Sequence, residues 1–161
     1  MKADYNSIAE HWRNARKALP QKDRELFELF LNELPANSRV LDLGCGHGIP
    51  VAKLISDQGH RITGVDHSEK LLTFAQIEMP EHEWLLNDLE NVEVTDNYNG
   101  IVIWDSLFHL PRQEHLTLLR KAWSALQPKE KIINFTNRRR LELGKALLKS
   151  TILKTVSIAD D

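Results

Sequence analysis

Two amphipathic helices are predicted at the start of the chain. Apolar residues recur three and four positions apart between about residues 6 and 34, a spacing that gives a helix one apolar face. Pro20 divides this stretch into two helices, because proline disrupts a helix interior. The sequence Pro35-Ala36-Asn37-Ser38 then breaks the pattern. Residues 39–43 are predicted to form a short buried strand that leads into a glycine-rich turn.

Strands and helices alternate after this point. A helix over about residues 49–58 ends at Gly59, the usual place for glycine after a helix, and a β-branched strand follows over 61–66. Ser68 can cap a helix over about 69–77. Further strands are predicted at about 83–87, 100–104 and 131–135, with a helix over about 112–126 between the last two. This order predicts an α/β fold with a doubly wound, mostly parallel sheet and right-handed crossovers.

Composition excludes several classes of protein. The 161 residues, 42% of them hydrophobic, suffice for one core but not for two ordinary domains. The net charge of −2 provides no overall field for nucleic acid or an anionic membrane. The single cysteine, Cys45, cannot form an internal disulfide, and no cysteine cluster has zinc-site spacing. We therefore expect no metal and a reducing, cytoplasmic compartment.

No targeting or membrane segment is predicted. The first twelve residues are polar where a signal peptide requires an apolar stretch. Nowhere does an apolar run approach the roughly 18 residues of a spanning helix. We expect no contact with a membrane.

The glycine-rich turn indicates a ligand site. Gly44, Gly46 and Gly48 stand where the first strand meets a helix, and glycine allows a ligand to approach the backbone closely. Asp66 ends the second strand, 18 residues beyond Gly48, where a carboxylate can accept both hydroxyls of a ribose. The NAD-binding version of this turn requires a glycine at position 49, which is Ile49. The pattern therefore favours an adenosine cofactor other than a nicotinamide.

Asp42 lies inside the first predicted strand. A buried carboxylate is costly unless hydrogen-bond donors or a cation lie nearby. A cationic ligand would offset that cost, and so would neighbouring backbone amides in a purely structural role. Both interpretations stay open at the level of sequence.

These motifs resemble those of a known family. The segment Val40-Leu41-Asp42-Leu43-Gly44-Cys45-Gly46-His47-Gly48 is similar to the first motif of class I S-adenosylmethionine-dependent methyltransferases, and Asp66 matches their ribose-binding acid. The resemblance places Asp88 near the adenine and Trp104 near the methionine part of the cofactor. It also implies an N-terminal cap helix that closes over the cofactor, carried by Tyr5-x-x-Ile8-Ala9-x-x-Trp12. From this resemblance we expect the cofactor to be bound by Tyr5, Trp12, Asp42, Gly44, Cys45, Gly46, Gly48, Asp66, His67, Asp88, Leu89 and Trp104.

The resemblance also predicts the organisation of the chain. It implies a single methyltransferase domain over residues 1–161, with cap helices in 1–36, a cofactor-binding core in 37–136 and an atypical tail in 137–161. Leu126-Gln127-Pro128 resembles the turn before the fifth strand, but Lys129-Glu130 replaces the usual glycine pair. The C-terminal strands are expected to be shortened or missing. An apolar sheet edge at this end predicts a homodimer formed through that edge or the tail.

The function implied is methyl transfer from S-adenosylmethionine to a small-molecule acceptor. Such a transfer needs mainly positioning, and His109, just past the fourth strand, is the candidate general base; a solvent-facing loop histidine is the alternative. A degenerate cofactor-binding module without efficient transfer is the leading rival. A nucleic-acid or protein methyltransferase is disfavoured by the balanced charge, and Arg138-Arg139-Arg140 is interpreted as a solvated face.

Overall fold

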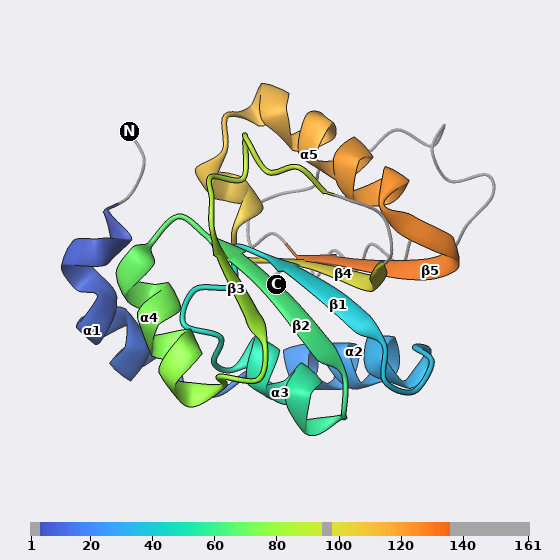
Figure 1. Ribbon diagram of the computed structural model, residues 1–161, viewed down its shortest axis with the longest axis horizontal. Helices are drawn as coiled ribbons and strands as arrows, with labels where there is room; N and C mark the ends of the chain where they lie inside the picture. The colour runs from blue at the N-terminus through green and yellow to red at the C-terminus, as the bar shows by residue number, and fades with distance from the viewer. Residues whose placement is uncertain (1–3, 95–97, 136–161) are drawn as a thin grey trace.

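Five parallel strands form one sheet in the computed structural model, which describes residues 4–94 and 98–135 (Figure 1). The strands are β1 (Arg39–Leu43), β2 (Arg61–Asp66), β3 (Glu83–Leu86), β4 (Tyr98–Trp104) and β5 (Leu126–Phe135). Their order is β3-β2-β1-β4-β5, with every neighbouring pair parallel. The strand order therefore reverses between β1 and β4. A ligand cleft is expected outside the carboxyl ends of the strands at such a switch point.

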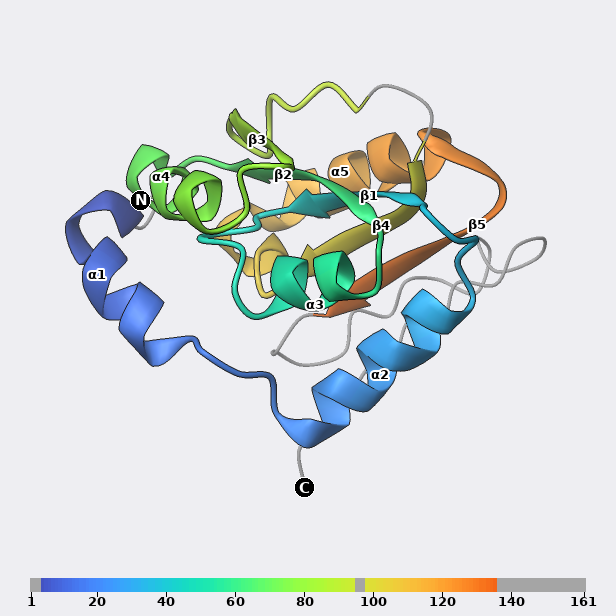
Figure 2. The same cartoon turned by 60° about the horizontal axis from the view of Figure 1, so that its bottom comes forward.

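Helices cover both faces of the sheet. They are α1 (Tyr5–Ala15), α2 (Gln21–Asn32), α3 (Val51–Asp57), α4 (Glu69–Glu78) and α5 (Arg112–Ser124), with a short 3₁₀ turn at Leu107–His109. Helices α2 and α3 lie against one face and α5 against the other, while α1 lies beside α4 at one end (Figure 2). The predicted doubly wound α/β fold is confirmed.

The side chains of each strand point alternately to the two faces of the sheet, which gives the protein a core on both faces. Val40, Val102 and Trp104 point to the face that carries α2 and α3, and they pack in one apolar cluster with Phe27 and Ile55. Their odd-numbered neighbours Leu41, Leu43, Ile101 and Ile103 join Leu118 of α5 in a second cluster on the other face. Because successive side chains of a strand point to opposite faces, a strand buried on both sides is apolar at most positions, and Asp42 is the exception in β1.

The fifth strand begins earlier than the sequence indicates. The predicted turn at residues 126–128 lies inside β5, which pairs with β4 from Leu126 onward. Tyr98 is opposite Leu126 and Gly100 is opposite Lys131, so the register shifts between these two pairs. Additional residues of β5 are accommodated there as an irregularity of the kind that bends a strand. The predicted tail over 137–161 and the arginines at 138–140 lie outside the described residues.

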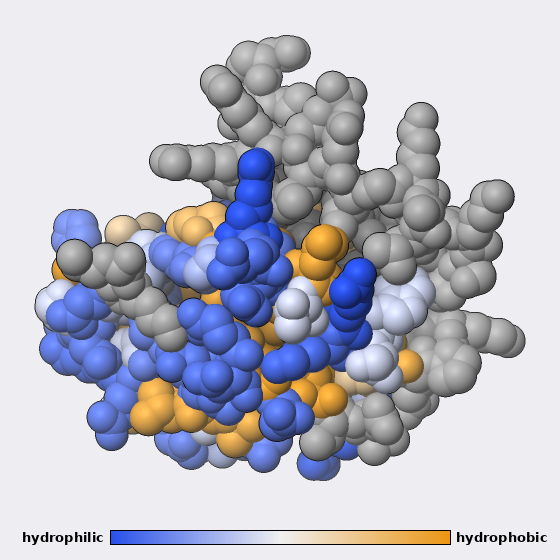
Figure 3. Space-filling model, turned by 90° about the horizontal axis from the view of Figure 1, so that it is seen from above, coloured by the Kyte–Doolittle hydropathy of each residue, from blue (hydrophilic) through white to orange (hydrophobic). Residues whose placement is uncertain are grey.

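The surface is largely polar where it faces solvent. On the face seen from the α5 side, hydrophilic side chains predominate and hydrophobic ones are scattered (Figure 3). None of the helices in the described part of the chain combines the length and the apolar character that a membrane span requires.

Candidate functional site

A cavity of about 980 Å³ opens at the carboxyl ends of β1, β2 and β4. This volume suits a small-molecule or cofactor site. The helix α1 and the connection from α1 to α2 contribute to its wall. Of the residues predicted from sequence, those that line it are Tyr5, Trp12, Asp42, Gly44, Cys45, Gly46, Asp66, His67, Asp88, Leu89, Trp104 and His109.

Two glycines of the turn have different roles. Gly46 has a φ of 57°, and a Cβ built there would meet nothing closer than Nε1 of Trp12 at 3.6 Å, so its open side faces the cavity. Gly48 has a φ of 82° and is not among the lining residues; a Cβ there would lie 2.6 Å from Cε of Met79. The positive φ favours glycine at both positions. Only Gly46 leaves space for a ligand, whereas Gly48 serves the packing of the turn against Met79 and Trp84.

Asp66 is held rigidly at the end of β2. Its Oδ2 accepts a hydrogen bond from the backbone N–H of Gly46, and its Oδ1 accepts one from the N–H of Ser68, both at 2.9 Å. The side chain is only 9% exposed and lines the cavity. Each carboxylate oxygen can accept more than one hydrogen bond. Asp66 can therefore join the glycine turn to β2 and still accept hydroxyls from a ligand.

Asp42 is buried in β1 without compensation for its charge. The residue is 1% exposed, and its Oδ2 has no hydrogen-bond partner. Burial, with a smaller contribution from the charge of Asp66, raises the pKa of the Asp42 carboxyl to about 7. The structural interpretation, in which backbone amides satisfy this carboxylate, does not apply to Oδ2. A ligand that brings a positive charge into the cavity would stabilise its ionised form.

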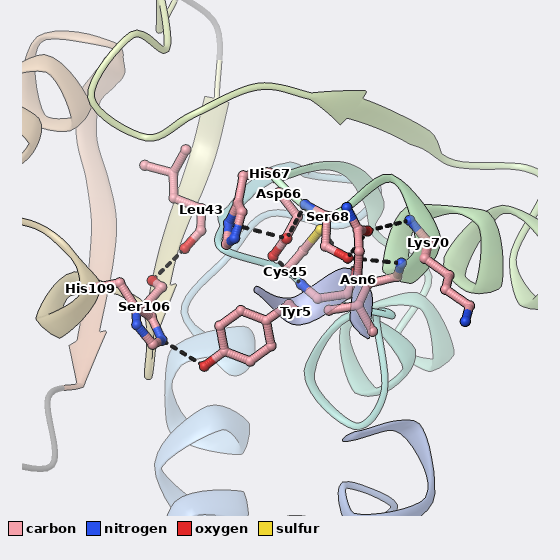
Figure 4. Close-up of polar contacts among 12 residues, drawn as sticks. Tyr5, Asn6, Leu43, Cys45, Asp66, His67, Ser68, Lys70, Ser106 and His109 are labelled. Atoms are coloured by element: carbon pink, nitrogen blue, oxygen red, sulfur yellow. Dashed lines mark hydrogen bonds and ion pairs between the residues drawn. The ribbon is translucent and has the colours of Figure 1, made fainter. Parts of the chain in front are cut away.

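The N-terminal helix closes over the cavity through specific contacts. The hydroxyl of Tyr5 lies 2.8 Å from Nε2 of His109 (Figure 4). The Tyr5 ring also makes edge contacts with His67 and Trp12. Oδ1 of Asn6 accepts hydrogen bonds from the Ser68 hydroxyl at 2.8 Å and from the N–H of Lys70 at 3.1 Å. Helix α1 is thereby attached both to the start of α4 and to the turn after β4.

The Tyr5–His109 pair is uncharged at neutral pH. Burial is the main cause that lowers the pKa of His109, with a further lowering by His67 and smaller opposing effects of Asp66 and of Asp105. Burial also raises the pKa of Tyr5, against the opposing charge of Arg16. The imidazole therefore keeps a nitrogen free of a proton, which a general base requires.

An ion pair that the sequence does not predict joins two charged residues of this cavity. Arg16 follows α1, and its Nη1 donates to Oδ2 of Asp105 at 3.0 Å. Asp105 follows β4 directly and has a φ of 50°, which a residue other than glycine rarely adopts. Both line the cavity, 89 positions apart in the sequence. The position of Asp105 at the carboxyl end of a strand was a usable signal, but no local pattern marks Arg16 as its partner.

Comparisons with known proteins identify the family of this chain. The family described as "Methyltransferase domain" matches residues 40–129, from β1 into β5. A carboxy-S-adenosyl-L-methionine synthase of Glaesserella parasuis is 33% identical over 100 residues, which cover 56% of this chain and 41% of that protein. A 27-O-demethylrifamycin SV methyltransferase of Amycolatopsis mediterranei is 26% identical over 132 residues, covering 73% of this chain and 46% of that protein. The chain spans less than half of the length of these curated relatives.

Solved structures show the same architecture. A TehB-like S-adenosylmethionine-dependent methyltransferase of Corynebacterium glutamicum has a TM-score of 0.61 and 26% identity, covering 74% of this chain and 65% of that one. The N-methyltransferase NodS of Bradyrhizobium japonicum, solved with S-adenosyl-L-homocysteine, has a TM-score of 0.64 over 80% of this chain and 70% of that one, and its 18% identity supports the fold alone. With a family match over more than half of its residues and with the glycine turn, Asp66 and the cap around one cavity, the chain belongs to the class I S-adenosylmethionine-dependent methyltransferases.

Proposed function

We propose that this chain binds S-adenosylmethionine through the glycine turn and Asp66 and transfers its methyl group to a small-molecule acceptor. The observation that carries the proposal is the Asp66 carboxylate, which two backbone N–H groups hold beside the open side of Gly46. A ribose can donate both of its hydroxyls to a carboxylate fixed in this way. Asp88 and Leu89 line the same cavity and are proposed to receive the adenine.

The residues of the cavity fit the charge of this cofactor. The bound cofactor supplies an electrophilic methyl group on a positively charged sulfur. The buried Asp42, with its unpartnered Oδ2, provides a negative charge that a cation would stabilise. Tyr5 and Trp12 of α1 line the cavity and are proposed to limit the access of water, so that donor and acceptor can be held at reacting distance.

His109 is the proposed base for acceptors that must lose a proton. Its imidazole is neutral at pH 7 and is held by the Tyr5 hydroxyl at 2.8 Å. Tyr5 thus positions the imidazole ring through its contact with Nε2. Because Tyr5 belongs to α1, the base is correctly placed only when the cap is closed.

The rival function is cofactor binding without methyl transfer. The relative from Glaesserella parasuis is named a carboxy-S-adenosyl-L-methionine synthase, and a structure of similar fold is described as a [4+2]-cyclase, at 23% identity and a TM-score of 0.56. The fold therefore serves other reactions than methyl transfer, and function depends on the site.

Calorimetric titration tests the cofactor site. S-adenosylmethionine should bind the wild type, and Asp66→Asn should weaken its affinity by about tenfold or more, because one charge-assisted acceptor is worth roughly 1.5–3 kcal/mol. Circular dichroism at the same temperature checks that the variant is folded. Equal affinities for the two proteins, or NAD bound more tightly than S-adenosylmethionine, would contradict the assignment.

Product formation separates the enzyme from the rival. The wild type is incubated with S-adenosylmethionine and a panel of amines, alcohols, thiols and carboxylic acids, and S-adenosylhomocysteine is measured. Product that forms only when an acceptor is present supports methyl transfer. Tyr5→Phe should lower kcat with little change in KM, because it disturbs the position of the base. Binding without product for any acceptor favours the rival.

A further inference from the structure

The cavity extends beyond the residues that are proposed to contact the cofactor. Asp66 and Asp88 lie at the ends of β2 and β3, whereas another part of the cavity lies between the α1–α2 connection and the turn after β4. We call this part, lined by Arg16, Leu19, Asp23, Asp105 and His109, the acceptor end. The inference below rests on the proposed function, because it concerns the acceptor that would bind there.

Acidic side chains predominate at and around the acceptor end. Setting aside the three acids assigned to the cofactor, and Glu90 beside Leu89 at the adenine end, the remaining charged residues that line the described cavity are Asp23, Glu25, Asp105, Arg16 and Lys22. The acids outnumber the two bases, and one of these bases is already paired with an acid. A carboxylate or phosphate acceptor would be placed among charges of its own sign, which is unfavourable in a partly buried site.

Asp105 is only partly neutralised. Its Oδ2 accepts from Arg16, but its Oδ1 is buried with no hydrogen-bond partner, and its side chain is 15% exposed. The charge of Asp105 also acts on Asp23 in the N-terminal turn of α2. Burial raises the pKa of Asp23, and the negative charge of Asp105 raises it further. Two carboxylates that interact with each other thus line the same cavity, and a positive charge close to both would be stabilised by both.

Arg16 shows that this end accommodates a cation. Its guanidinium lies 4.5 Å from the centre of the Trp12 ring while it donates to Asp105. A carboxylate combined with an aromatic face is the arrangement that binds ammonium and guanidinium groups. Arg16 therefore shows that these groups can bind a cation. Its single charge does not balance the remaining acids.

We propose that the methyl acceptor is an amine that enters the acceptor end as an ammonium ion, between Asp105 and Asp23. The ammonium nitrogen gives one proton to the neutral imidazole of His109 and so regains its lone pair. That lone pair forms the new N–CH₃ bond as the CH₃–S bond breaks, and the electron pair of the broken bond stays on sulfur. The products are a methylated ammonium ion and S-adenosylhomocysteine, with the proton on His109 released to solvent.

Three probes of equal shape and different charge test the proposal. Benzylamine, benzyl alcohol and benzoate are titrated into the full-length protein saturated with S-adenosylhomocysteine, and binding is followed by ligand-observed NMR at pH 7. Benzylamine, which is protonated there, should bind at least about tenfold more tightly than either analogue. Asp105→Asn should remove most of this preference, whereas Asp57→Asn, on the exposed surface of α3, should preserve it.

Each outcome of this experiment either supports or overturns the proposal. Because Asp105→Asn also loses a contact with Arg16, Asp23→Asn provides a second variant that leaves that contact intact, and it too should reduce the preference. Benzoate as the tightest probe would overturn the proposal and make Arg16 the recognition group for an anionic acceptor. Equal binding of the three probes, or no binding of benzylamine at millimolar concentration, would also overturn it. A protein that does not bind S-adenosylhomocysteine at all contradicts the proposed function instead.

Discussion

The charge of Asp42 should cost this protein stability as the pH rises. The carboxyl has an ordinary pKa of 3.8 in the unfolded chain and a pKa of about 7 in the folded one, mainly because burial penalises the ionised form. Between these two values the folded state binds more protons than the unfolded state, so stability falls with increasing pH. Below pH 4 the cost is absent, and above pH 7 it is fully present.

The magnitude follows from the separation of the two pKa values. About three pH units at roughly 1.4 kcal/mol each give an upper limit of about 4 kcal/mol above pH 7, with a slope of about 1.4 kcal/mol per pH unit below it. Asp42→Asn keeps the shape and removes the charge. The variant without cofactor should therefore become progressively more stable than the wild type from pH 5 to pH 7, with a constant difference above pH 7.

Urea unfolding at pH 5.5, 6.5, 7.5 and 8.5 measures this difference. Asp57→Asn is the matched control, because Asp57 is exposed and pairs with Lys53 on the same helix, so its difference from the wild type should change little over this range. S-adenosylmethionine should reverse the order for Asp42→Asn, since its positive charge stabilises the Asp42 anion. A stability difference that does not vary between pH 5.5 and 7.5, or a variant less stable than the wild type at pH 8.5 without cofactor, would refute the reasoning.

Two further predictions concern the glycine turn and assembly. Gly46→Ala and Gly48→Ala should each destabilise the fold by about 1–2 kcal/mol in urea, because both positions have a positive φ, but only Gly46→Ala should also weaken cofactor affinity measured by calorimetry. An equal loss of affinity in both variants would contradict their different roles. We also expect a homodimer by light scattering that becomes monomeric when residues 138–161 are removed; a monomer at high micromolar concentration of the intact chain would exclude it.

The sequence by itself determined the order of elements and the position of the glycine-rich turn. Hydrophobic periodicity is a local property, and so is the tendency of Pro20 and Gly59 to end a helix and of Ser68 to begin one. Apart from the start of β5, the helices and strands could therefore be predicted to within a few residues. The acid at the end of the second strand is likewise readable, because the end of a strand in a parallel sheet is where ligands bind. Burial on both faces also made the inner strands continuously apolar.

Only the tertiary structure decided which side chains meet. Arg16 and Asp105, or Tyr5 and His109, come together because α1 folds back over the carboxyl ends of the strands, and no spacing in the sequence encodes that contact. The different roles of Gly46 and Gly48 depend on whether open space or Met79 lies beside each Cα. The long β5 depends on backbone pairing with β4, which overrides the turn suggested by residues 126–128. The elevated pKa of Asp42 has the same origin, since desolvation is a property of the packed surroundings and not of the residue.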